Sequence, residues 1–156
     1  MALPRMFQTT RKTSTIQTMF RIILGVSLLG TGIAHLTWGR TSFLAQVPPW
    51  LPLDGDFVVV VSGIAELALA VGLIGFGRYR VPVGWAAAAF FVIIFPGNIS
   101  QYVNRTDGFG MTTDEPRAIR LLFQPVLVAW ALWSTGAWQA WRDSRQVTSS
   151  PTLPSA

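Results

Sequence analysis

Residues 57–77 have the sequence FVVVVSGIAELALAVGLIGFG, in which Glu66 is the one charged side chain. A helix made from this stretch is roughly 30 Å long at about 1.5 Å per residue, which matches the hydrocarbon thickness of a bilayer. We therefore predict that residues 57–77 cross a membrane as one helix.

Three further apolar runs of similar length occupy residues 20–36, 81–100 and 119–138. The whole chain is 51% hydrophobic and 12% charged, whereas a soluble domain is typically about 25% charged. Four such runs predict an all-α, integral membrane four-helix bundle, a single domain over residues 20–141. We expect a loose N-terminal tail over residues 1–19 and a disordered tail over the Ser-, Thr- and Pro-containing residues 142–156.

The net charge is +5, from 12 Lys and Arg against 7 Asp and Glu. These cations flank the apolar runs instead of forming a patch, which argues against nucleic acid as a partner. In cytoplasmic loops Lys and Arg are in excess, so the side with more cations should be cytoplasmic. Eight cations share the side of the N-terminus, namely Arg5, Arg11, Lys12, Arg21, Arg78, Arg80, Arg142 and Arg145, and four lie opposite, namely Arg40, Arg105, Arg117 and Arg120. The count predicts that both termini are cytoplasmic.

The chain contains no cysteine and one histidine, His35. Disulfides, thiol catalysis, iron–sulfur clusters and cysteine-ligated zinc are therefore excluded, and one chain cannot assemble a multi-histidine metal site. We predict no metal site. Any redox chemistry must use a bound cofactor or a partner.

Glu66 lies near the middle of its predicted span, and an ionisable residue at that depth is a functional hypothesis by default. His35, Asn98 and Gln124 all fall in the outer part of the predicted spans. Because helical side chains lean toward their own N-terminus, Glu66 should point outward while His35 and Asn98 point inward. Ser62, one turn from Glu66, extends this predicted polar pocket. Two alternatives stay open: Glu66 is a structural tie between helices, and His35 is an ordinary interfacial residue.

Two prolines beside the amides leave a further choice open. Pro96 and Pro125 lie inside predicted spans next to Asn98 and Gln124, and each proline frees a backbone carbonyl one turn earlier, Val92 in the case of Pro96. The amide side chains could repair these helices or could line a site. The sequence does not decide between these two roles of the amides.

Five short motifs occur in a recognisable order: His35-Leu36, FLAQVPPWLP at 43–52, SGIAE at 62–66, FPGN at 95–98, and Gln124-Pro125. In this order and spacing they resemble the DoxX-like family of small four-helix bacterial membrane proteins, over residues 20–141. The resemblance implies a four-span bundle in the bacterial cytoplasmic membrane. Some members are associated with quinone-linked oxidoreductases or with membrane-tethered redox-defence complexes, and the family is functionally heterogeneous.

From the pocket and the resemblance together we expect an accessory, non-catalytic component of a membrane redox system that holds a quinone or a similar lipid-soluble molecule. Glu66 would exchange a proton, His35 would help to set its charge, and the amides would hydrogen-bond the ligand's oxygens. No residue is assigned a catalytic role. The alternatives are a small-molecule or lipid carrier and a structural scaffold for a partner membrane protein. Expected partners are the lipid bilayer and either a membrane redox protein or a second copy of the chain.

Overall fold

The computed structural model describes residues 5–8 and 12–148, and within them the fold is helical throughout, with an isolated bridge between Gly108 and Met111. This confirms the predicted all-α class. The elements, in order, are η1 (Arg5–Phe7), α1 (Thr15–Leu36), α2 (Arg40–Leu44), α3 (Gly55–Gly75), η2 (Gly77–Tyr79), α4 (Arg80–Val103), α5 (Asp114–Ser134) and α6 (Ala137–Thr148).

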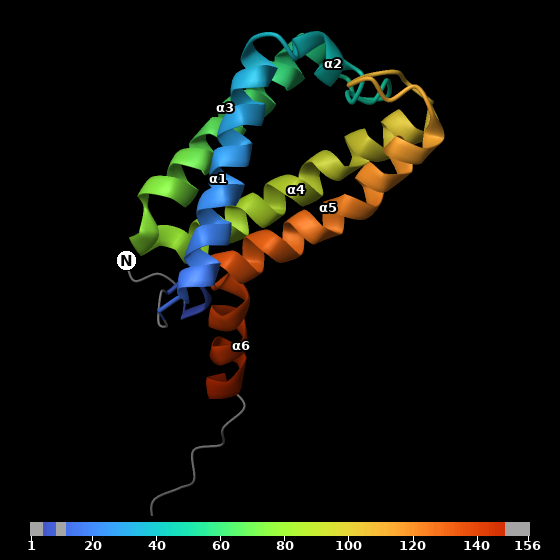
Figure 1. Cartoon of the computed structure of the whole chain (residues 1–156). Helices are drawn as coiled ribbons and strands as arrows, with labels where there is room; N and C mark the ends of the chain where they lie inside the picture. The colour runs from blue at the N-terminus through green and yellow to red at the C-terminus, as the bar shows by residue number, and fades with distance from the viewer. Residues whose placement is uncertain (1–4, 9–11, 149–156) are drawn as a thin grey trace, which may run out of the picture.

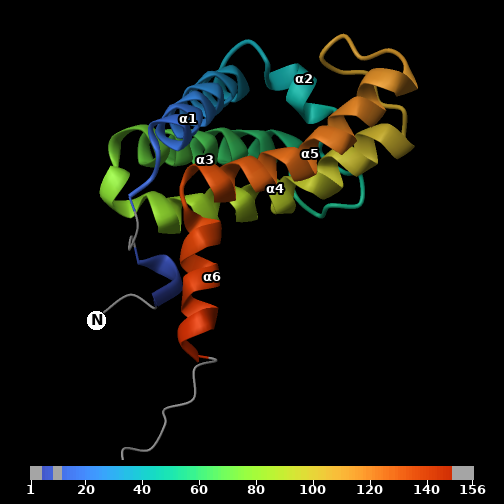
Figure 2. The same ribbon diagram turned by 60° about the horizontal axis from the view of Figure 1, so that its bottom comes forward.

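The four long helices form two pairs, α1 with α3 and α4 with α5 (Figure 1). The pairs meet at the end of the molecule from which α6 projects, which we call the α6 end. They diverge toward the opposite end, the α2 end, where α2 and the loops 45–54 and 104–113 lie (Figure 1). A second view shows α6 leaving the long helices at a steep angle (Figure 2).

Capping residues determine where α1 and α3 begin. Ser14 and Gln17 form a capping box, in which each side chain accepts a hydrogen bond from the other's backbone N–H, at 3.1 and 3.0 Å. Helix α1 therefore begins at Thr15, inside the segment predicted as an N-terminal tail. In α3 the Asp54 side chain accepts from the N–H of Phe57 at 2.9 Å, and the helix ends at Gly75.

The predicted fourth span, residues 119–138, is wrong at its C-terminal boundary. Helix α5 ends at Ser134, and Gly136 follows with a φ of +75°, a conformation that glycine adopts without steric cost. The chain bends by 68° between α5 and α6. Helix α6 then continues to Thr148, so residues 142–148 are helical where the sequence predicted a disordered tail. The rest of that predicted tail, 149–156, and residues 1–4 and 9–11 lie outside the described residues.

Small residues allow the helices to approach closely. A Cβ atom added to Gly32 of α1 would lie 3.0 Å from the carbonyl oxygen of Gly63 of α3. At the α6 end, a Cβ on Gly84 would lie 2.7 Å from the Cβ of Thr135. A buried core from all four long helices fills this half of the molecule and consists of Leu24, Leu28, Ala70, Leu73, Ala87, Ala88, Phe91 and Ala131.

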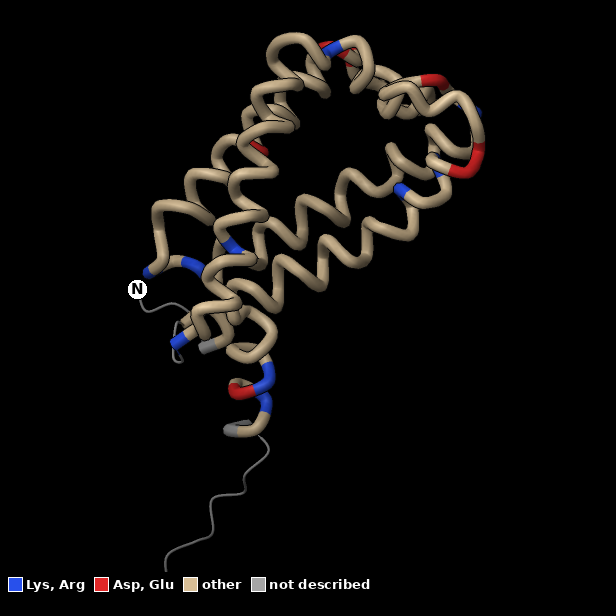
Figure 3. Tube along the Cα trace, in the orientation of Figure 1, with Lys and Arg blue, Asp and Glu red and all other residues tan. Residues whose placement is uncertain are grey.

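Among the described residues, three segments are long and apolar enough to cross a membrane: α1, α3 and Gly77–Val103. Helix α5 is long and apolar enough only when it is taken together with α6, across the bend between them. Large apolar side chains are exposed along these helices, Ile93 at 73% and Leu122 at 74%. Charged residues lie mainly at the helix ends, in the loops and on α6 (Figure 3). The surface of the long helices is therefore apolar over most of its length.

Candidate functional site

A cavity of about 590 Å³ lies between the two helix pairs. Side chains from α1, α3, α4, α5 and the loop after α2 line it, and most of them are apolar. Leu24, Leu28 and Phe91, which belong to the buried core, form its floor toward the α6 end. Its size is typical of sites for small organic ligands and cofactors.

All five residues predicted to form a polar pocket line this cavity. The α1–α3 wall carries His35, Ser62 and Glu66, and the α4–α5 wall carries Asn98 and Gln124. Across the described part of the chain, no hydrogen bond or ion pair joins these residues from one wall to the other. The structure thus brings the five together around one space, as two separate groups that face it.

Glu66 and His35 form the first group. Both are buried, with 6% and 7% of their surfaces exposed, and the Glu66 Oε2 atom lies 3.0 Å from the His35 Nδ1 atom. That nitrogen is also 2.9 Å from the carbonyl oxygen of Thr31. The Oε2 atom has no hydrogen-bond partner in the described residues and no contact with solvent. The His35 nitrogen is therefore the polar group nearest to this oxygen, and it is shared with the Thr31 carbonyl.

Asn98 and Gln124 form the second group and are also buried. The Asn98 Nδ2 donates to Gln124 Oε1 at 2.9 Å, and the Gln124 Nε2 donates to the carbonyl oxygen of Phe91 at 2.6 Å. The carbonyl that receives this bond neighbours Val92, the position that Pro96 was expected to free. The amides therefore tie α4 to α5 while lining the cavity, and in the described residues neither of them bonds the Val92 carbonyl that Pro96 was expected to free.

Arg120 also lines the cavity, although the sequence placed it among the outer-loop cations. It lies in α5 one turn before Gln124, and residues four apart share a helix face. That spacing is a signal in the sequence, but the position of Arg120 close to Arg117 at the edge of the apolar run favours a flanking cation instead. Its guanidinium carbon sits 4.7 Å from the ring centroid of Phe109, which is cation–π geometry.

Aromatic rings pack against one another at the α2 end, and one of them, Phe43, lines the cavity. The ring of Phe43 in α2 stacks on His35 with centroids 3.3 Å apart, and Phe109 meets Phe43 edge-on at 4.6 Å. Phe109 has a φ of +58°, which is uncommon for a residue with a side chain. The backbone of the loop is therefore unusual at Phe109, and the Phe109 ring lies between Phe43 and Arg120.

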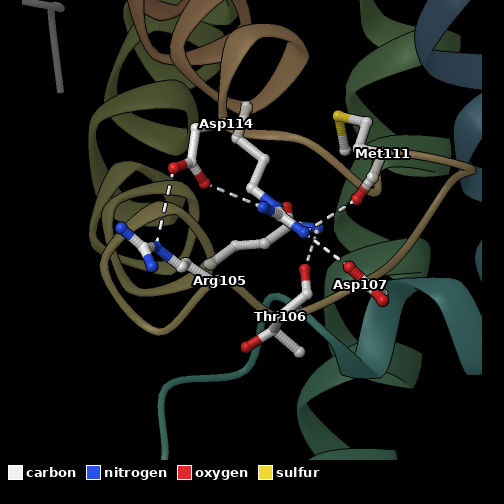
Figure 4. A network of polar contacts seen from close by, with 7 residues as sticks. Arg105, Thr106, Asp107, Met111 and Asp114 are labelled. Carbon is white, nitrogen blue, oxygen red and sulfur yellow. Dashed lines mark hydrogen bonds and ion pairs between the residues drawn. The ribbon is translucent and has the colours of Figure 1, made fainter.

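Arg117 is the anchor of that loop. Its guanidinium is buried and donates to Asp114 at 3.0 Å, to Asp107 at 2.5 Å and to the carbonyl oxygen of Met111 at 3.0 Å (Figure 4). These charge-assisted bonds connect both ends of the 104–113 loop to the start of α5. They fix the segment that carries Phe109.

The cavity thus combines one carboxylate, one imidazole, one guanidinium and two amides with an otherwise apolar lining. Such a site suits an amphiphilic ligand, because the few polar groups orient a head group while the apolar lining accommodates a ring or a chain.

Residues 24–135 match the family described as a domain of unknown function, DUF8561. The match covers more than half of the chain and includes every residue that lines the cavity. The chain belongs to this family. Comparison with curated proteins and with solved structures gives no significant match.

Proposed function

We propose that this chain is an integral membrane protein that binds a lipid-soluble ligand in the cavity between its two helix pairs. Helices α1, α3, α4 and α5 would each cross the bilayer, forming the four-span membrane bundle expected from the sequence. Helix α5 has 21 residues and is about 31 Å long, so it is long enough to cross alone. The bend after it would leave α6 outside the hydrocarbon region.

The proposed orientation places the α6 end in the cytoplasm of a bacterium and the α2 end outside the cytoplasmic membrane. The α6 end carries Lys12, Arg78, Arg142 and Arg145, in line with the excess of cations on cytoplasmic sides. Trp138 and Trp141 of α6 lie together, with ring centroids 5.1 Å apart. Aromatic rings of this kind are typical of a membrane interface.

The route into the cavity supports a ligand that comes from the bilayer. Phe57, Val61 and Ile93 line the cavity, yet 56%, 46% and 73% of their surfaces are exposed. An opening bordered by exposed apolar side chains on α3 and α4 would face lipid chains and not water. The ligand's apolar part would occupy this opening, and its head group would lie between Glu66 and Arg120.

Within this framework the preferred function is an accessory role in a membrane redox system, with a quinone or a similar molecule as ligand. The DoxX-like resemblance supports this choice. A redox partner would take the two electrons of the reduced ligand, Glu66 would accept its two protons one after the other and pass each on to solvent, and His35 would help to set the charge of that carboxylate. The partner would be another membrane protein, or a second copy of the chain would complete the assembly.

The observation that carries the proposal is the buried pair of Glu66 and His35, with Oε2 and Nδ1 3.0 Å apart, in the wall of a mostly apolar cavity. Its test is to purify the full chain in a mild detergent, extract the bound lipids and identify them by mass spectrometry. A quinone enriched over its level in the membrane extract is expected with the wild type, and its loss is expected with Glu66→Gln at unchanged helix content. Equal lipid profiles for the wild type, the variant and an unrelated membrane protein would overturn the proposal.

The divergence of the two helix pairs favours a lipid carrier as the second candidate. The cavity is closed by packed core residues at the α6 end and lies between diverging helices at the α2 end (Figure 1), as in a carrier that is open to one side. Transfer of a labelled lipid between the leaflets of proteoliposomes, faster than in protein-free vesicles, would favour this candidate over the redox role.

A further inference from the structure

We propose that the cavity selects a neutral head group that donates a hydrogen bond, and that Glu66 makes this selection. A hydroxyl-bearing amphiphile such as a hydroquinone would bind more tightly than the carbonyl compound with the same ring and tail. This inference deepens the function proposed above and rests on it, because it assumes that the cavity is a ligand site.

The hydrogen bonds around His35 indicate which groups can donate. The Nδ1 atom lies 2.9 Å from the carbonyl oxygen of Thr31, and a carbonyl oxygen can only accept. Nδ1 must therefore carry the hydrogen. The same N–H lies 3.0 Å from Glu66 Oε2, and one hydrogen cannot serve two acceptors fully. Oε2 is shielded from solvent and lies against this N–H, so the carboxylate oxygen left to face the cavity is Oε1, which receives no hydrogen bond from the described residues.

The other polar groups of the α4–α5 wall do not supply a donor to this oxygen. Asn98 donates to Gln124, and Gln124 donates to the Phe91 carbonyl. Leaving a buried acceptor without a hydrogen bond costs free energy. A ligand that brings an O–H group to Glu66 removes this cost, whereas a ligand with only carbonyl oxygens does not.

Arg120 completes the selection. It lines the same cavity as Glu66 and, apart from its contact with the Phe109 ring, has no hydrogen bond or ion pair in the described residues. A hydroxyl group can donate to the carboxylate and accept from the guanidinium through the same oxygen. A fatty-acid carboxylate could accept from Arg120, but Glu66 would repel its charge. The pair therefore favours a neutral hydroxyl over both a carbonyl and an acid.

The test uses a quinone with a decyl tail and its two-electron-reduced hydroquinone, so that the ring and the tail stay constant. Binding of each form to the full chain in nanodiscs is measured by equilibrium dialysis under anaerobic conditions, with empty nanodiscs as the blank. The wild type is expected to bind the hydroquinone about tenfold more tightly, since hydrogen bonds to charged groups are among the stronger ones. In Glu66→Gln the neutral amide oxygen is a weaker acceptor for the hydroxyl, so binding of the hydroquinone should weaken and the preference should fall to about twofold or less.

A matched control is Gly30→Ala, because a Cβ at Gly30 meets no atom within 4 Å; it should keep the tenfold preference. Equal binding of the two forms by the wild type would overturn the selection while leaving the proposed function in place. Binding of neither form would overturn both. A preference that survives in a folded Glu66→Gln variant would show that Glu66 is not the selecting residue. If Glu66→Gln does not fold, the binding of the two forms to the wild type still tests both the selection and the proposed function.

Discussion

Gly63 of α3 lies directly against His35 of α1, so closely that a Cβ atom on Gly63 would be 2.7 Å from the Cβ of His35. Gly63 precedes Glu66 by about one helical turn. The close approach of the two helices is therefore what brings the imidazole to the carboxylate.

Replacing Gly63 by Ala should separate α1 from α3 and lower stability, because the added methyl group has no space. We expect a loss of about 1–3 kcal/mol, typical of overpacking, seen as a lower Tm in detergent. Gly30→Ala is the control, since its new methyl group meets no atom and alanine favours a helix. Equal Tm values for the two variants would contradict the close packing of α1 on α3.

Replacing Gln124 by Leu should destabilise the α4–α5 pair. The substitution removes the side-chain donor to the Phe91 carbonyl and leaves the buried Asn98 Nδ2 without its acceptor, at a cost of about 1–3 kcal/mol for the unsatisfied amide. Thermal unfolding in detergent measures the effect. The nearby Leu122→Ala, at a side chain 74% exposed, should change Tm little, and an equal effect of both substitutions would argue against a role for the amide bonds.

Replacing Arg117 by Gln should release the 104–113 loop, because its buried guanidinium bonds Asp107, Asp114 and Met111. Hydrogen exchange in this loop should rise strongly. Arg105→Gln is the matched control: Arg105 approaches Asp114 at 3.5 Å, but its side chain is 76% exposed, and such pairs contribute about 0–1 kcal/mol. Similar exchange in both variants would refute the anchoring role of Arg117.

The proposed orientation can be tested with single cysteines, because the native chain has none. In intact cells a membrane-impermeant maleimide should label Thr112→Cys, in the loop before α5, and should not label a cysteine appended after Ala156. After the cells are opened, both should react. Labelling of the appended cysteine alone in intact cells would invert the orientation.

Much of the architecture was predictable from the sequence. The long apolar runs gave three helices with boundaries within a few residues, since length and hydropathy alone distinguish such segments. The direction of each helix and the lean of its side chains also predicted that Glu66 and His35 would point toward one another, and they lie in contact.

Other features could not be predicted because they depend on single backbone conformations or on contacts distant in sequence. The bend at Gly136 needs one residue in a left-handed conformation, and a glycine within an apolar run does not by itself indicate that conformation. Arg120 shares a helix face with Gln124, but a cation at the edge of an apolar run is more typical of a flanking charge than of a cavity. The contact of Phe109 with Phe43 joins the 104–113 loop to α2, which is far from it in the chain.

The packed α6 end has a mechanical consequence. Gly84 and Thr135 leave no space between α4 and the end of α5, and the core residues join both pairs there. A movement that widens the cavity must therefore be a rotation of one pair against the other about this end. Displacement grows with distance from such a pivot, so the contact between Phe43 and Phe109 separates first as the molecule opens and re-forms last as it closes.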